Sequence, residues 1–559
     1  MRATRFKSEP HPLESLRPQT MNSGAARTGF VLTTPLVGGG KARIDFLLAT
    51  PLVGAVHGLA FGATHPAALQ WPAFAILAGA VFLLRSQRQW PVLLLCCALF
   101  WLTSYGVGLR WIAAALMAPQ SLGVALGSLV YCLLVFGLAS ASILTLWLAA
   151  ALAAPIRSEA LYCATLSTAL LCGDLLRELV LPSFPWLSVG YAHVEGPLAA
   201  LLPIVGVQGA GWFAQWTALL AGSAILSVSN RRLPREALLT LTALVVLLPL
   251  LPTAATRDRG SLRVVAYQTA VSPKDKFRAS LFGRHLQEIG DVTREQAAQL
   301  VVTPETAVPT SLRALTPAQE HFLEDSVSAT RALLFGAFAE DSRGDVFNSG
   351  VLLQRSADGR SLQRTIYIKQ HLAPIGEYAP PGFGWIADLL NFPITNLRAT
   401  RDPPQNFVVA GTSIIPTICQ DLLYGDDLRT TTHTPRLLVN LSNIAFFKAP
   451  LIRTQLLNIA RARALEQQVP LLIAANYGPT AFINASGIIE RELPAGAPGA
   501  LEVTVHPRTG ATLYARFGNE LVYLLAGLTL AAAALTPLLR QFIAALRRAR
   551  HAAAPREPA

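Results

Sequence analysis

The chain has 559 residues, of which 52% are apolar and only 14% are charged, and its formal net charge at pH 7 is +13. So high an apolar fraction excludes a set of ordinary soluble domains. The excess of positive charge would suggest nucleic acid as a partner in a soluble protein, but here the basic residues gather in particular loops between apolar runs, so we expect no nucleic-acid binding.

Apolar runs long enough to cross a bilayer occur at eight places. Each has about 17 to 30 residues, and a helix of that length spans a hydrocarbon core of roughly 30 Å. We therefore predict a polytopic α-helical membrane protein with about eight transmembrane helices. The runs are residues 44–64, 69–85, 91–115, 122–153, 159–181, 198–228, 236–255 and 519–545.

The segments around these runs divide the chain into domains. The N-terminal segment is rich in Arg, Pro, Ser and Gly and lacks the continuous apolar stretch of a cleavable signal, so we predict a disordered tail followed by an uncleaved anchor. The predicted parts are this tail at 1–43, a membrane domain of seven helices at 44–256, one soluble domain at 257–517, the eighth helix at 518–546 and a basic C-terminal tail at 547–559.

Basic residues are distributed unevenly between the two sides that the eight runs define. They precede the first run, follow the last and occupy the loops after the second, fourth and sixth runs, whereas the other loops carry few, chiefly Arg110 and Arg177. By the positive-inside rule both termini are cytoplasmic, and the soluble domain lies on the far side of the membrane. The loop and tail residues concerned are Arg85, Arg88, Arg157, Arg231, Arg232, Arg235, Arg540, Arg547, Arg548 and Arg550.

The soluble domain alternates strand-like and helix-like patterns. Its short apolar runs are bounded by Gly, Pro, Asn and Asp, and helical patterns occupy residues 280–300 and 450–468. This alternation predicts an α/β layered domain whose strands are covered on both faces. The predicted strands are residues 262–268, 300–303, 332–337, 349–353, 407–419, 437–441 and 471–475.

Three short motifs place a reactive residue at the end of a strand-like run. They are Thr303-Pro-Glu305, Lys369-Gln-His-Leu and Thr417-Ile-Cys419-Gln-Asp421, and Cys419 is the only cysteine between residues 257 and 517. A lone thiol, a carboxylate and an amine can serve as nucleophile, base and charge stabiliser. The ten histidines form no cluster with cysteine or carboxylate at metal-ligand spacing, so we predict no metal and no cofactor.

These motifs resemble the Glu-Lys-Cys triad of the nitrilase (carbon-nitrogen hydrolase) superfamily, which implies an αββα sandwich. The stretch Phe184-Pro-Trp-Leu-Ser-Val-Gly-Tyr191, with Gly196-Pro-Leu and Gly206-Val-Gln-Gly after it, is similar to the membrane part of the apolipoprotein N-acyltransferase family. That resemblance runs from about residue 50 to 517. It implies a multi-pass protein of the bacterial inner membrane, with a periplasmic catalytic domain and both termini cytoplasmic.

The resemblance also implies a two-step acyl transfer. Glu305 would take the proton from Cys419 and later from the incoming amine, while Lys369 and the backbone N–H of Gln420 would stabilise the oxyanion. The partners would be a phospholipid acyl donor and a lipidated apolipoprotein acceptor, and we expect a monomer. Glu377 would orient or polarise the lysine, or it would be an ion-pair partner that holds the loop.

Several positions depart from the family pattern, and all lie close to the motifs. In the family the nucleophile is commonly followed by Tyr-Glu, whereas here Gln420-Asp421 follow it. The Asp421 side chain is one methylene shorter than that of a glutamate and does not reach as far. The family's Ser-Asn-Asp-Ala-Trp-Phe becomes Ser442-Asn443-Ile444-Ala-Phe446-Phe447, which retains Asn443 as a supporting residue. Leu456 stands where a histidine is common in the family, and Phe277 stands where a tryptophan is common.

These departures leave alternatives open. The protein could be a diverged paralogue, such as a conjugal-transfer protein, that uses the triad on another acceptor. It could be an amide hydrolase, or an assembly factor with weak or no catalysis. A transporter would need paired charges inside the apolar runs, and the main candidates, Asp174, Arg177 and Glu178, lie near one end of a run where we expect them to be interfacial.

Overall fold

The computed structural model divides into two units, residues 1–37 and 38–559. It describes residues 41–63, 66–118, 121–180, 184–251, 254–374, 376–379, 384–385, 396–400, 407–430, 434–447 and 449–552, all of which belong to the second unit. The predicted N-terminal tail lies outside the described residues up to residue 40, and the predicted C-terminal tail lies outside them from residue 553 onwards.

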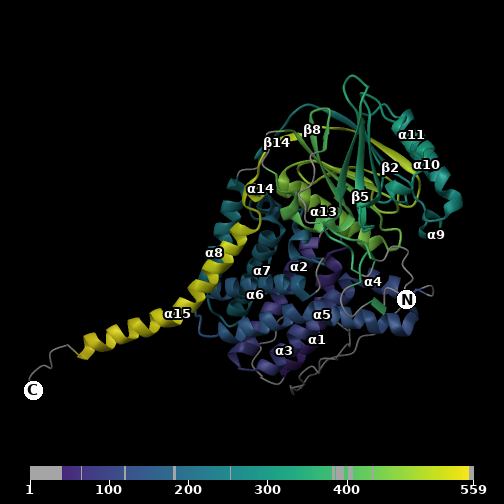
Figure 1. The fold of residues 1–559 in the computed structure, drawn as a ribbon. Coiled ribbons are helices and arrows are strands. Elements are labelled where there is room, and N and C mark those ends of the chain that lie inside the picture. Colours follow the sequence, from purple (N-terminus) through teal and green to yellow (C-terminus); the bar gives the residue numbers. More distant parts are fainter. Residues whose placement is uncertain are drawn as a thin grey trace, which may run out of the picture. The chain divides into compact units, whose positions relative to one another are not determined.

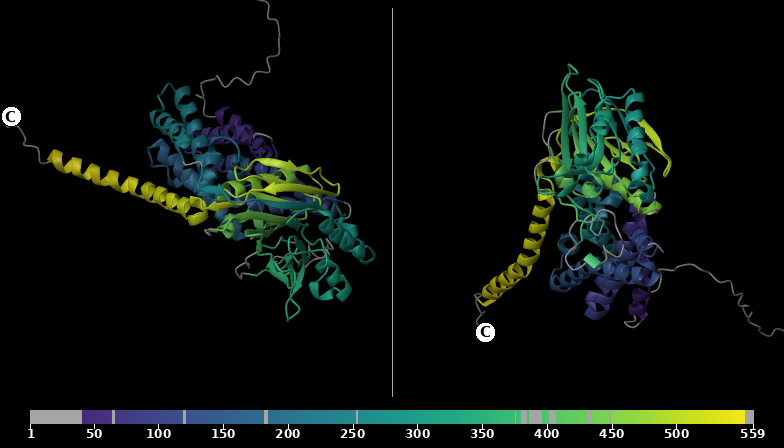
Figure 2. Two further views of the ribbon diagram at one scale, coloured as in Figure 1. Left: turned by 90° about the horizontal axis from the view of Figure 1, so that it is seen from above. Right: turned by 45° about the vertical axis from the view of Figure 1, so that its right-hand side comes forward.

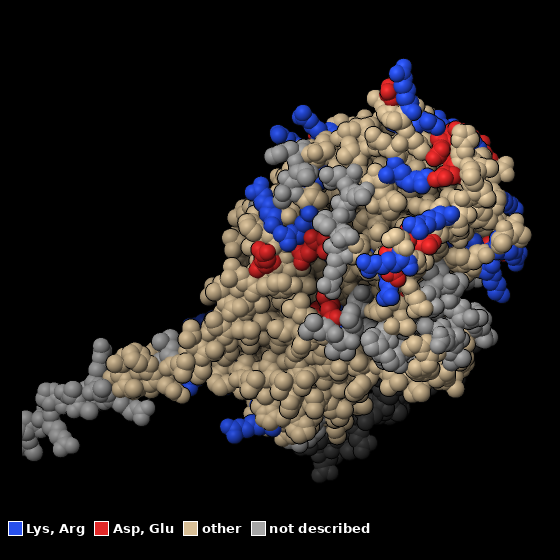
Figure 3. Space-filling model, in the orientation of Figure 1, with Lys and Arg blue, Asp and Glu red and all other residues tan. Residues whose placement is uncertain are grey.

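Six of the described helices are long and apolar enough to cross a membrane. The helix α2 packs against α7, α7 against α6, and α6 against both α5 and α15. In Figure 3 the charged side chains gather over the strands, while the surface over the helices is mostly uncharged. The six are α2 (Pro66–Ser86), α3 (Trp90–Gly108), α5 (Gly123–Leu152), α6 (Glu159–Val180), α7 (Leu202–Ser229) and α15 (Glu520–Ala552), and the helix α1 (Lys41–Ala60) has a shorter apolar part.

The predicted first and seventh spans are shorter than expected. The first falls on the apolar part of α1, Ile44–Ala60, and the seventh on α8 (Arg235–Leu247), which has 13 residues and would extend only about 20 Å at the usual helical rise. The count of eight spans therefore stays a prediction. The predicted third span is also divided, because α3 ends at Gly108 and a separate helix, α4 (Arg110–Leu116), follows.

Between α8 and α15 the chain folds into two stacked sheets with helices outside them, the predicted αββα sandwich (Figure 1). One sheet has the order β13-β2-β3-β4-β5-β6, and the other β1-β14-β9-β10-β11-β12, with β8 pairing to β9 and β7 to β8. The strands are β1 (Thr256–Asp258), β2 (Leu262–Gln268), β3 (Leu300–Val302), β4 (Ala332–Glu340), β5 (Val346–Arg355), β6 (Leu362–Ile368), β7 (Phe407–Val409), β8 (Thr412–Ile418), β9 (Arg436–Ser442), β10 (Leu471–Ala475), β11 (Ala481–Ile483), β12 (Ile489–Glu492), β13 (Gly499–Val505) and β14 (Arg508–Gly510).

Alternating side chains of the buried strands supply the layers of the sandwich. In β2, Val264 packs between the sheets, while its neighbour Val265 faces Leu286 of α10, as the two-residue period of a strand requires. Figure 2 shows α10 and α11 outside the six-stranded sheet. These outer helices are α10 (Ala279–Glu295) and α11 (Pro317–Glu324), and α13 (Pro450–Gln467) covers the other sheet.

The strand predicted at 407–419 is wrong in one respect. It is two antiparallel strands, β7 and β8, joined by a turn at Ala410 and Gly411. Both turn residues have positive φ, +47° and +75°, which is the backbone that a tight two-residue hairpin needs. The glycine was the available signal, but the apolar residues on both sides concealed it.

Helix α13 contacts both the sheet and the apolar helices. Its Gln455 accepts a hydrogen bond from Trp111 Nε1 at 3.0 Å and donates to the Gly108 carbonyl at 2.8 Å. Near its other end, the Glu466 carboxylate accepts from the Val207 N–H at 2.8 Å. That N–H is available to Glu466 because α7 is interrupted at Gly206, whose φ is +66°. The α/β part is therefore bonded directly to the helices.

Candidate active site

The structure brings three of the predicted residues together at one edge of the sandwich. Glu305 follows β3, and Lys369 follows β6. The Lys369 Nζ lies 3.0 Å from Glu305 Oε1 and 2.8 Å from Glu377 Oε2. All three side chains are buried, so the ammonium is held between two carboxylates away from bulk water.

Asn348 was not predicted, and it links the two carboxylates. It lies on β5, and its Nδ2 donates to Glu305 Oε1 and to Glu377 Oε1, each at 2.7 Å. The backbone carbonyl of Asn348 accepts from the backbone N–H of Lys369 at 2.9 Å. The signal in the sequence was an amide side chain directly before the predicted strand at 349–353, since buried amides need partners.

Cys419 occupies a strained position at the end of β8. Its φ is +50°, a left-handed conformation that costs a residue with a side chain roughly 1–2 kcal/mol. It begins a short 3-10 helix, η5 (Cys419–Leu423). Such strain persists where the surroundings fix the turn, and it is common at functional sites.

Asp421 fixes that turn. Its carboxylate accepts from the Ile418 N–H at 3.0 Å, from the Tyr367 hydroxyl at 2.9 Å and from the His371 N–H at 2.9 Å. Burial raises the pKa of Asp421 to about 6. The short side chain thus joins the loop after β8 to the loop after β6, which carries Lys369.

Gln420 and Asn443 also brace loops. The Gln420 side chain donates to the His371 carbonyl at 3.2 Å, while its backbone N–H stands in the first turn of η5, where helical N–H groups have no partner within the helix. Asn443 accepts from Asn476 Nδ2 at 3.2 Å and from the Ala445 N–H at 3.3 Å. Within the described part of the chain, Asn443 makes no hydrogen bond to Cys419.

The electrostatics of the site favour a protonated thiol and a charged lysine at rest. Burial raises the pKa of the Cys419 thiol to about 12, the Glu305 and Glu377 charges add to the rise, and Lys369 and the Ser442 hydroxyl oppose it. Burial alone would lower the pKa of Lys369, but Glu305 and Glu377 outweigh it and raise that pKa well above its ordinary value. A base is therefore needed before this thiol can act as a nucleophile.

A second buried ammonium, also not predicted, lies beside Glu305. Lys276 ends the short helix α9 (Pro273–Lys276), is 5% exposed, and donates from Nζ to the Glu305 carbonyl at 2.8 Å. The next residue, the departure Phe277, packs against the apolar cluster that contains Leu372 of the Lys369 loop.

The other departures lie on the face toward the apolar helices. Ile444 is buried and Phe446 is 39% exposed. Their neighbour Phe447 meets the Trp111 ring edge-on, with the ring centroids 4.7 Å apart. Leu456 is buried in α13. These altered residues therefore leave the ion pair of Lys369 with Glu305 and Glu377 unchanged.

Fold and site together define a multi-pass membrane protein with a carbon-nitrogen hydrolase domain. The family model described as carbon-nitrogen hydrolase matches residues 263–514. A second model, for the N-terminal domain of apolipoprotein N-acyltransferase, matches residues 54–220. The chain belongs to the apolipoprotein N-acyltransferase family.

Named relatives agree with this assignment. The apolipoprotein N-acyltransferase of Ralstonia nicotianae is 34% identical over 357 residues, which are 63% of this chain and 67% of the relative. That of Bordetella bronchiseptica is 33% identical over 393 residues, 65% of this chain and 71% of the relative. Among solved structures, the amidase from Nesterenkonia sp. AN1 is similar over 47% of this chain and 98% of its own, with 16% identity and a TM-score of 0.33.

Proposed function

We propose that the protein is an N-acyltransferase that moves an acyl chain from a phospholipid, through a thioester on Cys419, to the N-terminal amine of a lipidated apolipoprotein. The observation that carries the proposal is the burial of Lys369 between Glu305 and Glu377. Asp421 joins the loop of Lys369 to the loop of the strained Cys419, and the charges of Glu305, Lys369 and Glu377 all act on the pKa of its thiol. Membership of the family supplies the substrates.

In the first step the thiol proton passes from Cys419 to Glu305, and the thiolate attacks the ester carbonyl of the phospholipid. Lys369 and the Gln420 N–H stabilise the negative oxygen of the tetrahedral intermediate, and losing one such donor typically costs about 3 kcal/mol. The C–O bond then breaks. The lysophospholipid leaves as an alcohol with the proton from Glu305, and the acyl group remains on sulfur.

In the second step the amine of the apolipoprotein attacks the thioester. Glu305 takes a proton from the attacking nitrogen, the C–S bond breaks, and the sulfur recovers a proton to regenerate the thiol. Ping-pong kinetics follow from a covalent intermediate between two substrates. The Glu377 carboxylate and the Asn348 amide hold the ammonium and the base in place throughout.

We further propose the setting that the positive-inside rule predicts. The catalytic domain is periplasmic, both termini are cytoplasmic, eight helices span the inner membrane, and the protein is a monomer. The domain boundaries at 44–256, 257–517 and 518–546 go with this topology. One hydrogen bond supports it: the hydroxyl of Tyr191, which follows α6, donates to the Leu423 carbonyl of the α/β domain at 3.3 Å, and Glu178, near the end of α6, interacts electrostatically with His371 and Asp426.

Rescue of growth tests the proposal. In a strain depleted of its own N-acyltransferase, the wild type should restore growth and Cys419→Ala should not. Cys132→Ala is the matched control, because Cys132 is exposed on α5. Incubation with a phospholipid labelled in its acyl chain, without acceptor, should leave label on Cys419 as a hydroxylamine-sensitive thioester. Release of free acid instead would indicate a hydrolase.

The second candidate is a paralogue that uses the same chemistry on another acceptor. It is favoured by Ile444 and Phe446, which replace the family's Asp and Trp on the loop whose Phe447 meets Trp111. Thioester formation without rescue of growth would select this candidate. Rescue by Cys419→Ala would select the assembly factor.

A transporter is disfavoured by the contacts of its candidate charges. Arg177 is buried rather than interfacial, pairs with Asp174 at 3.4 Å and donates to the Tyr105 hydroxyl. A guanidinium with a carboxylate and a phenol as fixed partners is a structural cluster, since buried charges within a membrane must be paired.

A further inference from the structure

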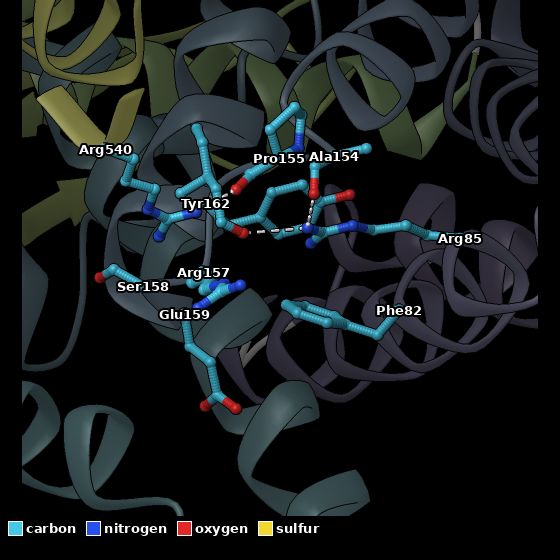
Figure 4. A pocket seen from close by; sticks show the side chains of 10 residues that line it. Phe82, Arg85, Ala154, Pro155, Arg157, Ser158, Glu159, Tyr162 and Arg540 are labelled. Atoms are coloured by element: carbon cyan, nitrogen blue, oxygen red, sulfur yellow. Dashed lines mark hydrogen bonds between the residues drawn. The ribbon is translucent and has the colours of Figure 1, made fainter. Parts of the chain in front are cut away.

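A pocket of about 530 Å³ lies at the other end of α6 from the site described above. Figure 4 shows three arginines around it, which come from three separate segments. Arg85 is at the end of α2, Arg157 lies between α5 and α6, and Arg540 is on α15. The Phe82 and Tyr162 rings form part of its wall.

Hydrogen bonds fix two of the arginine side chains that line the pocket. Arg85 donates to the Ala154 and Ile156 carbonyls at 2.5 and 3.0 Å, and its guanidinium lies 3.7 Å over the Tyr162 ring. Arg540 donates to the Pro155 carbonyl at 2.7 Å. Backbone carbonyls and a ring thus hold two of the guanidinium groups in fixed positions.

The three arginines outnumber the two carboxylates at the pocket, Glu159 in its lining and Glu236, which accepts from the lining residue Ser158 at 2.8 Å. Among the described residues, none of the three forms an ion pair with a carboxylate. The single lining carboxylate, Glu159, accepts hydrogen bonds from Ser223 and Ser227 at 2.9 and 3.3 Å. The lining therefore carries a surplus of positive charge.

The level of the pocket in the membrane indicates which group can neutralise its positive charge. Helix α6 has 22 residues, about 33 Å at the usual rise, which matches the hydrocarbon thickness. The pocket adjoins Glu159 at one end of this helix, and Glu178 near the other end interacts with the α/β domain. Phosphates of the opposite leaflet lie at this level, and guanidinium forks bind phosphate oxygens well.

We propose that the pocket bounded by Arg85, Arg157 and Arg540 binds the phosphate of an anionic phospholipid in the leaflet opposite the catalytic domain. This lipid is not the acyl donor, because the two sites are separated by the length of α6. Basic pockets between transmembrane helices hold anionic head groups in this way. The inference needs membrane-spanning helices and does not depend on the catalytic proposal.

Native mass spectrometry of the full-length protein tests the site. After reconstitution in phosphatidylcholine nanodiscs with or without phosphatidylglycerol, the wild type should retain phosphatidylglycerol selectively. Arg157→Gln and Arg540→Gln should each weaken retention about fivefold. Arg232→Gln is the matched control, because Arg232 is exposed in the loop after α7 and does not line the pocket.

Three outcomes would overturn the inference. Retention by the Arg157→Gln, Arg540→Gln double variant equal to the wild type would exclude the pocket as the site, as would an equal loss in Arg232→Gln. Thermal protection by inorganic phosphate, with no gain from phosphatidylglycerol, would show that the site takes free phosphate rather than lipid.

A different observation, the second ammonium of the active site, carries a second inference. The Lys276 Nζ is bonded to the backbone carbonyl of Glu305, and the following residue, Thr306, has a left-handed φ of +47°. The lysine therefore holds the turn that aims the base. It is also close enough to interact electrostatically with Cys419 and with the Glu305 carboxylate.

We infer that Lys276 is a positioning residue that fixes the Glu305 turn and, while protonated, favours ionisation of Cys419. It acts with Lys369 and against Glu305 and Glu377, the other charges that face the thiol. His285 of α10 is close enough to interact electrostatically with Lys276, whereas Asp275 of the same helix pairs with Arg278 at 3.2 Å. The inference rests on the proposed role of Cys419 as nucleophile.

The pH dependence of thiol alkylation separates this role from a merely structural one. Burial lowers the pKa of Lys276 to about 8, against the opposing effects of Glu305 and Cys419. Below that pH the wild type should react with iodoacetamide faster than Lys276→Met, by severalfold, since each unit of thiol pKa is tenfold in thiolate. Above it the lysine is neutral, and the two rates should converge.

Two further variants sharpen the test. Lys276→Arg keeps its charge at every pH, so it should react faster than the wild type above pH 8. Lys274→Met, exposed on the same helix, should match the wild type throughout. A rate ratio for Lys276→Met that does not change with pH would overturn the inference, whereas acyl transfer by Cys419→Ala would overturn the proposed function instead.

Discussion

Replacement of Glu305 by Gln should have opposite effects on acyl transfer and on thiol reactivity. The Glu305 charge is the largest contribution after burial to the raised pKa of Cys419. Glutamine keeps the shape and an oxygen that can accept from Lys369, but it removes this charge and the base. We therefore expect acyl transfer to disappear while the thiol itself becomes easier to ionise.

The size of the effect follows from the position of the thiol pKa. With a pKa of about 12, roughly one thiol in ten thousand is ionised at pH 8. A fall of about one unit in the thiol pKa would give tenfold more thiolate. The alkylation rate would then rise only about threefold, because a less basic thiolate is also a weaker nucleophile. Alkylation of Cys419 should thus be about three- to tenfold faster in Glu305→Gln.

The assay is iodoacetamide labelling of purified full-length protein at pH 8, followed by mass spectrometry of the Cys419 peptide. Acylation from labelled phospholipid is measured in parallel. Glu377→Gln is the matched control, since its charge acts on the thiol in the same direction but less strongly, so it should speed alkylation less. Slower alkylation in Glu305→Gln than in the wild type would refute the electrostatic reasoning.

Three further predictions concern stability. In Gly336→Ala the new Cβ would lie 2.3 Å from the Thr306 nitrogen, so we expect a loss of about 2–3 kcal/mol by thermal unfolding and impaired thioester formation. Gly350→Ala, on the paired position of the next strand, meets atoms no closer than 3.7 Å and should be tolerated. Cys419→Gly should be about 1 kcal/mol more stable than Cys419→Ala, because glycine accepts the φ of +50° without strain. Burial raises the pKa of Glu466 from 4.5 to about 7, so its protonation should stabilise the fold at low pH by up to about 3 kcal/mol, a contribution lost as the pH rises through 7 and absent in Glu466→Gln.

Each of these predictions has a contrary result. Equal melting temperatures for the two glycine variants would mean that the turn after Glu305 can move away. A less stable Cys419→Gly would mean that the left-handed turn is not strained. The Glu466 prediction follows from the sign of the shift: the folded protein binds the extra proton between about pH 4.5 and 7. A melting temperature with the same pH dependence in the wild type and Glu466→Gln would contradict it.

The sequence predicted the class of fold because the pattern of apolar and polar residues in each element depends on whether the element lies in lipid, in the protein core or in water. Strands β2 and β10 have the predicted bounds, 262–268 and 471–475, since their residues, apart from Arg263, are buried on both faces. Strands β1, β6 and β11 to β14 were not predicted, because they are very short or lie in mostly polar or glycine-containing sequence with no clear period. The departures from the family pattern could be named from the sequence, but the contacts of Asp421 could not.

What the sequence determined by itself was the apolar helices, the layered α/β domain and the positions of Glu305, Lys369 and Cys419 at strand ends. The tertiary structure decided what surrounds them. Asn348 meets a carboxylate 43 residues away, and Lys276 meets a carbonyl 29 residues away. Such contacts depend on how loops from separate strands pack together, which no local pattern encodes, and the charges that tune the thiol therefore became visible only in the folded protein.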